Sequence, residues 1–178
     1  LKTNAEGFGV QIITDNGTVW NLKEGNRPDS LTADSVYRVV SRFAPVADSE
    51  AVAYSFWKVI SPLPKPESEY ESIHLDPVDI QSIWQSGDYL NMVLQVMVKD
   101  KEHELSFIDN GITSNANGTQ TLHLTLYHHR KDDVEGFMQK YYLSVPLWHY
   151  EGKLNKGDTI VFELYTYKEG MTQRTFTY

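Results

Sequence analysis

Apolar and polar residues alternate with a period of two along most of the second half of the chain, which is typical of β-strands with one face on a core. Turn-forming pairs such as Gly87-Asp88 and Asn117-Gly118 separate the alternating stretches. The apolar sets that share a face are Leu90, Met92, Leu94, Val96 and Val98; Leu122, Leu124 and Leu126; Leu143, Val145 and Leu147; and Ile160, Phe162 and Leu164. Strands are therefore expected over 78–85, 88–99, 103–109, 121–128, 140–149, 158–167 and 173–178. Strands of this number and length predict an immunoglobulin-like β-sandwich over 76–178.

Three local features refine this expectation. Pro146 has no backbone N–H to give a sheet, so its strand should lie at an edge or bend there. Asn110-Gly111 reads as a turn after the strand 103–109. The polar stretch 131–139 shows no periodicity and is predicted to be a loop.

The first part of the chain is also rich in β-forming residues. Strands are expected over 8–14 and 19–22, joined by an Asn16-Gly17 turn, and over 36–43 and 51–60. In the third of these, Tyr37, Val39, Ser41 and Phe43 form the predicted buried face. No helical pattern interrupts the strands, so 1–61 is predicted to form a small OB-like β-barrel, and the fold class is all-β.

Between the two blocks, prolines alternate with charged residues. Pro62, Pro64 and Pro66 stand among several Glu and Ser residues that have no apolar face to bury. The stretch 62–75 is therefore expected to be a linker between the barrel and the sandwich.

Composition limits the kinds of partner. Sixteen Lys plus Arg stand against 24 Asp plus Glu, a net charge of −8, and the basic run His128–Lys131 is followed at once by Asp132 and Asp133. Binding to nucleic acid or to an anionic membrane surface is thus not expected. The chain has no Cys, which excludes disulfides, thiolate zinc sites and Cys nucleophiles.

No motif for catalysis, metal or cofactor binding stands out. His128 and His129 are adjacent and point to opposite faces of a strand, and the six histidines are interpreted as exposed strand-end side chains. Asp132 and Asp133 are interpreted as a solvated turn, because the loop lacks the ligand spacing of a calcium site. The paired carboxylates near turns, such as Glu102 and Glu104, are interpreted as solubility residues. We therefore expect no catalytic residues, no metal and no cofactor.

Aromatic residues are the one unusual signal. Tyr142, Trp148, Tyr165 and Tyr167 are opposite in phase to the apolar positions of their strands and should project from one sheet. Such side chains suit cross-strand packing, contact with the barrel, a protein partner or stacking on a sugar. They are the predicted partner or ligand surface.

The chain resembles the NigD-like proteins, envelope lipoproteins of Bacteroides relatives. The likeness is carried by Ile12–Trp20 (IITDNGTVW), by Asp76–Trp84 (DPVDIQSIW) and by Gly87–Asn91 (GDYLN), in matching order and spacing. The resemblance implies the same architecture, an OB-like barrel followed by a β-sandwich. The family pattern also includes a lipid-acceptor Cys that precedes these segments, so a chain beginning at Leu1 is expected to have been trimmed downstream of it.

The resemblance implies a function as well as a fold. It predicts a non-enzymatic protein of the bacterial cell envelope, attached to the outer membrane through the lipid anchor, with a protein partner and an immunity-like role. A carbohydrate-binding module of the envelope is the alternative, favoured by the aromatics and the acidic balance of charge.

Overall fold

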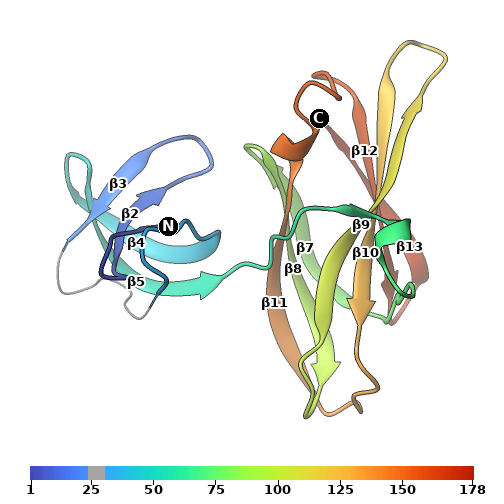
Figure 1. Cartoon of the computed structure of the whole chain (residues 1–178), viewed down its shortest axis with the longest axis horizontal. Coiled ribbons are helices and arrows are strands. Elements are labelled where there is room, and N and C mark those ends of the chain that lie inside the picture. The colour runs from blue at the N-terminus through green and yellow to red at the C-terminus, as the bar shows by residue number, and fades with distance from the viewer. Residues whose placement is uncertain (24–30) are drawn as a thin grey trace. The chain divides into compact units, whose positions relative to one another are not determined.

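A computed structural model describes residues 1–23 and 31–178 (Figure 1). The chain divides into two compact units, Leu1–Val59 and Ile60–Tyr178. Both consist of β-strands joined by turns, with two short 3-10 helices in the described part of the second unit, and the predicted all-β class is confirmed. No helix among the described residues is long and apolar enough to cross a membrane.

The first unit is a curved sheet that closes on itself. Its strands in the described residues are β1 (Lys2–Thr3), β2 (Gly9–Ile13), β3 (Val19–Leu22), β4 (Val39–Ala47) and β5 (Glu50–Lys58). They are hydrogen-bonded in the order β1-β2-β3-β5-β4, with β3 parallel to β5. Leu1 and Tyr37 exchange two backbone hydrogen bonds of 2.8 Å, which joins β1 to the chain just before β4. This topology is compatible with the expected OB-like barrel.

The pattern of side chains explains the inner face of the first unit. Ile12, Leu22, Ala51 and Ala53 are buried in its core. Three of the four residues predicted for the buried face of 36–43 pack against this core, namely Tyr37, Val39 and Phe43. The Asn16-Gly17 turn forms as expected, with Gly17 at a φ of 85° and the Thr14 N–H donating to the Thr18 carbonyl at 2.9 Å.

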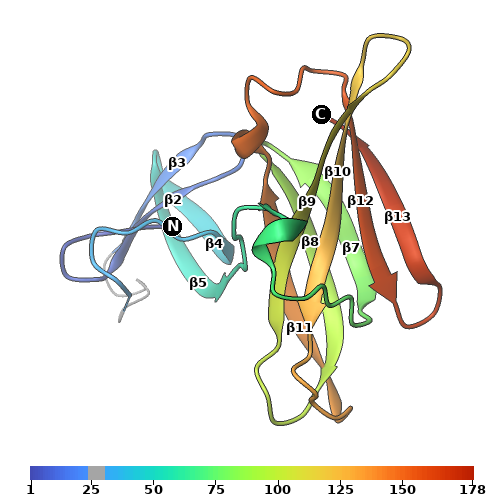
Figure 2. The ribbon, with the colours of Figure 1, turned by 45° about the vertical axis from the view of Figure 1, so that its right-hand side comes forward.

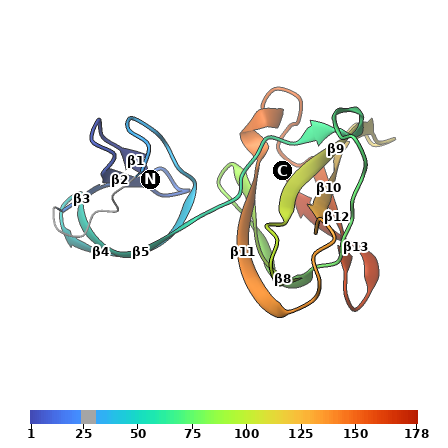
Figure 3. The ribbon, with the colours of Figure 1, turned by 60° about the horizontal axis from the view of Figure 1, so that its bottom comes forward.

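The second unit is a sandwich of two sheets (Figures 2 and 3). A three-stranded sheet has the order β11-β8-β7, and a five-stranded sheet has the order β13-β12-β10-β9-β6. Its elements are β6 (Lys65–Pro66), η1 (Glu67–Glu69), β7 (Asp79–Ser86), β8 (Tyr89–Val98), β9 (Glu104–Ser114), β10 (Gln120–His129), β11 (Phe137–Pro146), η2 (Leu147–Tyr150), β12 (Thr159–Thr166) and β13 (Gly170–Thr177). Most neighbours are antiparallel, whereas β10 pairs with β12, and β6 with β9, in parallel.

The core lies between these two sheets and is built from the four alternating sets. Every residue of those sets is buried, and together with Phe107 and Val78 they form one cluster. Fully burying one such side chain contributes about 1.5–3 kcal/mol, so this cluster supplies most of the drive for sandwich formation. The period of two thus predicted both the strands and the face that each presents to the core.

Several strand ends differ from the sequence prediction. Strand β9 continues through Asn110-Gly111 to Ser114, because these two residues form a bulge opposite His123 and do not turn the chain. Gly111 has a φ of 91°, which a residue with a side chain rarely adopts. Strand β11 begins at Phe137, within the predicted loop, and ends at Pro146, where the chain bends into η2 as the proline predicted.

The predicted linker 62–75 is not a linker in the structure, because it lies along the sandwich. Lys65 and Pro66 pair with β9, and the Tyr70 hydroxyl donates to the Phe107 carbonyl at 3.0 Å. The backbone N–H of His128 donates to the His74 carbonyl at 3.0 Å. The prolines therefore mark a short edge strand and an irregular segment that covers β9 and β10. This edge strand and cover use few of the regular hydrogen bonds between strands.

Candidate functional site

The four aromatic residues of the predicted surface do not form one cluster on one sheet. Tyr142 lies in β11 of the three-stranded sheet, whereas Tyr165 lies in β12 of the five-stranded sheet. Trp148 lies in η2, because the strand expected over 140–149 ends at Pro146. The prediction that these side chains project from one sheet required that the strand continue through Trp148 and that the strands of Tyr142 and Tyr165 belong to the same sheet. Neither condition holds.

Two of the four are well exposed. Trp148 is 48% exposed on η2, while its neighbours Leu147 and Tyr150 are buried and fix the short helix to the core. Tyr165 is 42% exposed and lies opposite Met171 of β13, which is exposed to a similar degree. Exposed aromatic side chains such as these two are common at the contacts between proteins.

Tyr167 has a structural contact instead. It follows the last residue of β12, and its hydroxyl accepts a hydrogen bond of 3.0 Å from the backbone N–H of Met97 in β8. Burial raises the pKa of the Tyr167 phenol. This phenol therefore connects the end of the five-stranded sheet to the three-stranded sheet. Tyr142 and Tyr167 are both only partly exposed.

The end of the sandwich formed by 97–103 and 130–138, here termed the tip, carries a further apolar group that the sequence analysis missed. Val134, Phe137 and Met138 are 57%, 59% and 40% exposed. Phe137 and Met138 lie at the start of β11, opposite Val98 and Met97. Three apolar residues within a stretch that is otherwise polar were the available signal for this surface.

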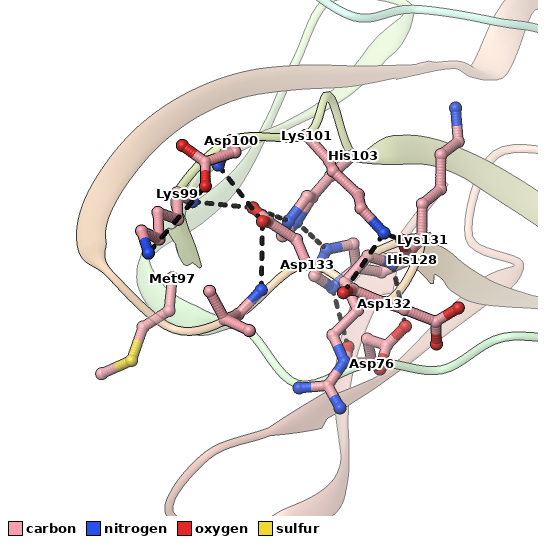
Figure 4. Close-up of polar contacts among 12 residues, drawn as sticks. Asp76, Met97, Lys99, Asp100, Lys101, His103, His128, Lys131, Asp132 and Asp133 are labelled. Carbon is pink, nitrogen blue, oxygen red and sulfur yellow. Dashed lines mark hydrogen bonds and ion pairs between the residues drawn. The ribbon is translucent and has the colours of Figure 1, made fainter.

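A buried polar network lies beneath the tip (Figure 4). The Asp133 carboxylate contacts His103 Nε2 at 3.3 Å, and His103 Nδ1 lies 2.9 Å from His128 Nε2. His128 Nδ1 in turn lies 2.9 Å from the Asp76 carbonyl. The network thus runs from the β10–β11 loop through β10 to the segment before β7, and its three side chains are 6% exposed or less.

The surroundings of Asp133 favour its ionised form. Its carboxylate accepts backbone hydrogen bonds from Lys99 at 2.7 Å, from Asp100 at 3.2 Å and from Val134 at 3.0 Å. The Lys99 N–H above all, together with the N–H groups of Asp100 and Lys101, holds the pKa of Asp133 well below its usual range, against the opposing effect of burial. Burial lowers the pKa of His128, which the hydrogen bond to the Asp76 carbonyl only partly offsets.

These positions correct two expectations from the sequence. His103 and His128 are buried, not exposed at strand ends, and Asp133 is buried, not part of a solvated turn. The two histidines could have been found from the strand period, because His128 is in phase with Leu126, and His103 is in phase with Leu105. Asp133 lies in a loop, where no periodic signal exists.

The remaining histidines near this region lie on the outer face. His129 points away from His128, as the alternation predicted, and its ring stacks on His74 at 3.6 Å. The His74 ring also meets Tyr127 edge-on at 6.1 Å. In the described residues, no group of three His, Asp or Glu side chains is arranged to hold a metal ion.

Comparison with known proteins identifies the second unit. The sequence profile of the NigD-like C-terminal beta sandwich domain matches residues 61–178. No functionally curated protein is significantly similar to the chain.

Solved structures extend the likeness to the full length. A NigD-like immunity protein from Bacteroides caccae is 29% identical, with a TM-score of 0.79 over 100% of this chain and 93% of that one. A candidate toxin-related protein from Parabacteroides distasonis is 17% identical, with a TM-score of 0.72 over 99% and 90% of the two chains. A candidate lipoprotein from Bacteroides fragilis, 9% identical with a TM-score of 0.62 over 94% and 90%, shares the fold. Since the family profile covers most of the chain and the sandwich has the corresponding architecture, the chain belongs to the NigD-like family.

Proposed function

We propose that the chain is a non-enzymatic protein of the bacterial cell envelope that binds a protein partner in an immunity-like role. The observation that carries this proposal is the similarity, over the whole chain, to a protein described as a NigD-like immunity protein. The envelope location rests on the resemblance to the family, in which a lipid anchor precedes the segments described above. The anchor is the proposed membrane attachment.

The distribution of exposed apolar side chains supports binding to a protein. Trp148 and Tyr165 on the body of the sandwich, and Phe137 on the tip, are each more than 40% exposed. Large apolar and aromatic side chains dominate the energetics of protein interfaces, and truncating one can cost about 2 kcal/mol or more. Of the four residues first predicted, Trp148 and Tyr165 are the proposed contact residues, with the partly exposed Tyr142 and Tyr167 in supporting positions.

Among the described residues, the His and Asp side chains beneath the tip most resemble a catalytic group, but their burial favours a structural role. His103, His128 and Asp133 are at most 6% exposed, so a substrate cannot reach their polar atoms. Every nitrogen and oxygen of the contacts between them is already directed at a protein atom. A general base must be within hydrogen-bond reach of its substrate, and these groups are not.

The positions of the aromatic residues do not favour the alternative of a carbohydrate-binding module. Sugar stacking by the predicted surface requires several aromatic faces in one strip, whereas Tyr142 and Tyr165 lie in different sheets. Trp148 lies in the short helix η2 and so belongs to neither strand.

The test is site-specific photo-crosslinking in native envelopes. A photoreactive phenylalanine analogue at 148, 165 or 137 should capture a protein, and the matched control at Tyr54, an exposed tyrosine of the first unit, should not. The captured protein is then purified and titrated against the wild-type chain and against Trp148→Ala, Tyr165→Ala and Phe137→Ala. Saturable binding that weakens tenfold or more in one of these variants supports the proposal. Equal affinity for all variants, or binding of purified glycans in place of any protein, contradicts it.

A further inference from the structure

The buried network beneath the tip has a hydrogen-bond acceptor at each end. The Asp133 carboxylate already accepts from the Lys99 N–H, so it acts as an acceptor toward His103 as well. At the other end the Asp76 carbonyl can only accept. Between these acceptors lie two imidazoles, whose four ring nitrogens make three contacts of 3.3, 2.9 and 2.9 Å.

These contacts require one more proton than two neutral imidazoles carry. Each contact needs one hydrogen between its two heavy atoms, which makes three, whereas a neutral imidazole has one ring N–H. Any arrangement of two neutral rings therefore leaves two lone pairs facing each other in one contact. Leaving a buried acceptor unpaired destabilises the folded chain, and does so more strongly next to a charge. A third ring proton satisfies all three contacts at once.

The geometry also indicates which ring is the cation. With the charge on His103, His128 donates from Nδ1 to the Asp76 carbonyl, and its Nε2 accepts from His103 Nδ1 across the contacts of 2.9 Å. His103 then donates from Nε2 to Asp133, and the side chains of this ion pair are 1% and 2% exposed. The charge on His103 faces a carboxylate directly, whereas a charge on His128 would face a carbonyl. Burial, which lowers the pKa of His128, disfavours the second arrangement.

We propose that His103 is a buried imidazolium paired with Asp133, and that the His103–His128 pair is a pH-sensitive clasp that holds the tip together in its three-proton state. The clasp connects the segments from which the tip is built. Asp133 accepts from Lys99 and Asp100 of the β8–β9 loop, and His128 fixes the Asp76 segment. Beside it, Lys101 Nζ donates to the Lys131 carbonyl at 2.6 Å.

Other charged and titratable groups lie near the clasp, but the third proton is assigned to an imidazole. Asp76 is paired with Arg130, whose Nε lies 3.4 Å from Oδ1. Charges on Glu102 and Asp133 raise the pKa of Tyr141, after the larger effect of burial, and Glu135 does the same for Tyr167. Imidazole is the side-chain type in this set that ordinarily titrates between about pH 5 and 8. The charged and titratable groups recorded around the clasp are Asp76, which acts on His128; Lys101, whose backbone N–H acts on Asp133; and Tyr141, which interacts with Asp133 and Glu102. Next to them, Tyr167 interacts with Asp76, Arg130 and Glu135.

The clasp is sensitive to pH in both directions. On the alkaline side, loss of the third proton leaves Asp133 without its counter-charge and one contact without a hydrogen. On the acid side, a fourth proton places two N–H groups against each other in the 2.9 Å contact. The pKa of His128 in the folded chain is lowered from 6.5, so the unfolded chain takes up this proton first, and stability is lost as the pH falls below 6.5 toward the lowered pKa of the folded chain.

The direct test is a count of ring protons by nuclear magnetic resonance on the whole chain labelled with ¹⁵N. At pH 7, His103 should show two protonated ring nitrogens and His128 one, with all three protons in slow exchange. His149, on η2, lies outside the network and is the internal reference. A neutral His103 with a single ring proton, in a chain with the same ring contacts, would overturn the proposal.

The variant Asp133→Asn tests the role of the counter-charge. It should remove the second ring proton of His103 at pH 7, while His149→Gln leaves it in place. Exchange of the Lys99 and Val134 amide protons in the wild type, corrected for intrinsic rates, should be slowest in a window around neutral pH. It should rise by roughly tenfold or more outside that window, the equivalent of one charge-assisted hydrogen bond. Exchange that is flat from pH 5 to 9 would contradict the clasp, even if Asp133→Asn proves unable to fold.

Discussion

Tyr70 stacks on Tyr127 with ring centroids 4.6 Å apart, and this contact joins the segment 62–75 to the outer face of β10. Tyr127 is only 5% exposed although it points away from the sandwich core, because this segment covers it. The cover is continuous with Ile60, whose backbone N–H donates to the Tyr142 carbonyl at 2.9 Å. The second unit therefore includes the whole of 60–75.

A truncation pair tests this boundary. A chain consisting of 60–178 should fold on its own, whereas one consisting of 76–178 should be less stable by about 3 kcal/mol or more. The shorter chain loses β6, the Tyr70 hydrogen bond and the burial of Tyr127. Urea unfolding followed by circular dichroism gives both free energies. Equal values would mean that 60–75 only lies against the sandwich without stabilising it.

Two substitutions at Tyr70 separate its hydroxyl from its ring. Tyr70→Phe removes the donor to the Phe107 carbonyl and should cost about 1 kcal/mol. Tyr70→Ala also removes the stack on Tyr127 and should cost about 2–3 kcal/mol. Tyr54→Ala, at a tyrosine that is 67% exposed, is the control and should change the free energy of unfolding by less than about 0.5 kcal/mol. A Tyr70→Ala variant as stable as the control would contradict the assigned role of the stack.

The contrast between β10 and its cover shows what the sequence could predict. The alternation of Leu122, Leu124 and Leu126 identified the core face because every second residue must enter the same layer. The cover has no such constraint, since it is held by isolated backbone hydrogen bonds and by the rings of Tyr70 and His74. Its prolines and carboxylates therefore looked like those of a linker, although the segment is packed and Pro64 is buried.

The candidate sites were predictable to different degrees for the same reason. His128 continues the buried phase of β10, so the period could have predicted its burial although it was interpreted as exposed, whereas Asp133 of the same network comes from a loop. The phase of Tyr165 was correct because β12 is regular up to Thr166. Trp148 is exposed beside the buried Leu147, as its phase indicated, but the strand expected to carry it ends at Pro146, where the backbone turns into η2. Whether two strands belong to one sheet depends on contacts between distant residues, which no local pattern contains.

The bulge in β9 gives a prediction about backbone conformation. Gly111 has a φ of 91°, and no atom beyond Gly111 and its two chain neighbours lies within 4 Å of the place where a Cβ would stand. Gly111→Ala should therefore destabilise the sandwich through backbone strain alone, by about 1–2 kcal/mol. Ser114→Ala, at the exposed end of the same strand, is the control. Thermal unfolding of the two variants provides the measurement, and equal midpoints would show that the bulge accepts a side chain without strain.

The last prediction concerns Tyr150, which is 1% exposed and donates its hydroxyl to the Asp109 carboxylate at 3.0 Å. Burial, together with the charge of Asp109, raises the pKa of this phenol well above 10. The folded chain thus keeps a proton that the unfolded chain releases near pH 10, so Tyr150 contributes stability below that pH and the contribution is lost as the pH rises further. Tyr150→Phe removes this pH-dependent part. It also leaves Asp109 with one donor fewer, although the Gly111 N–H still donates to the same carboxylate. We expect the variant to be about 1–2 kcal/mol less stable than the wild type at pH 8, with the difference shrinking above pH 10. Urea unfolding at pH 8 and pH 10.5 measures both values. A difference that stays constant over this range would show that the phenol ionises in the folded chain as it does in the unfolded one.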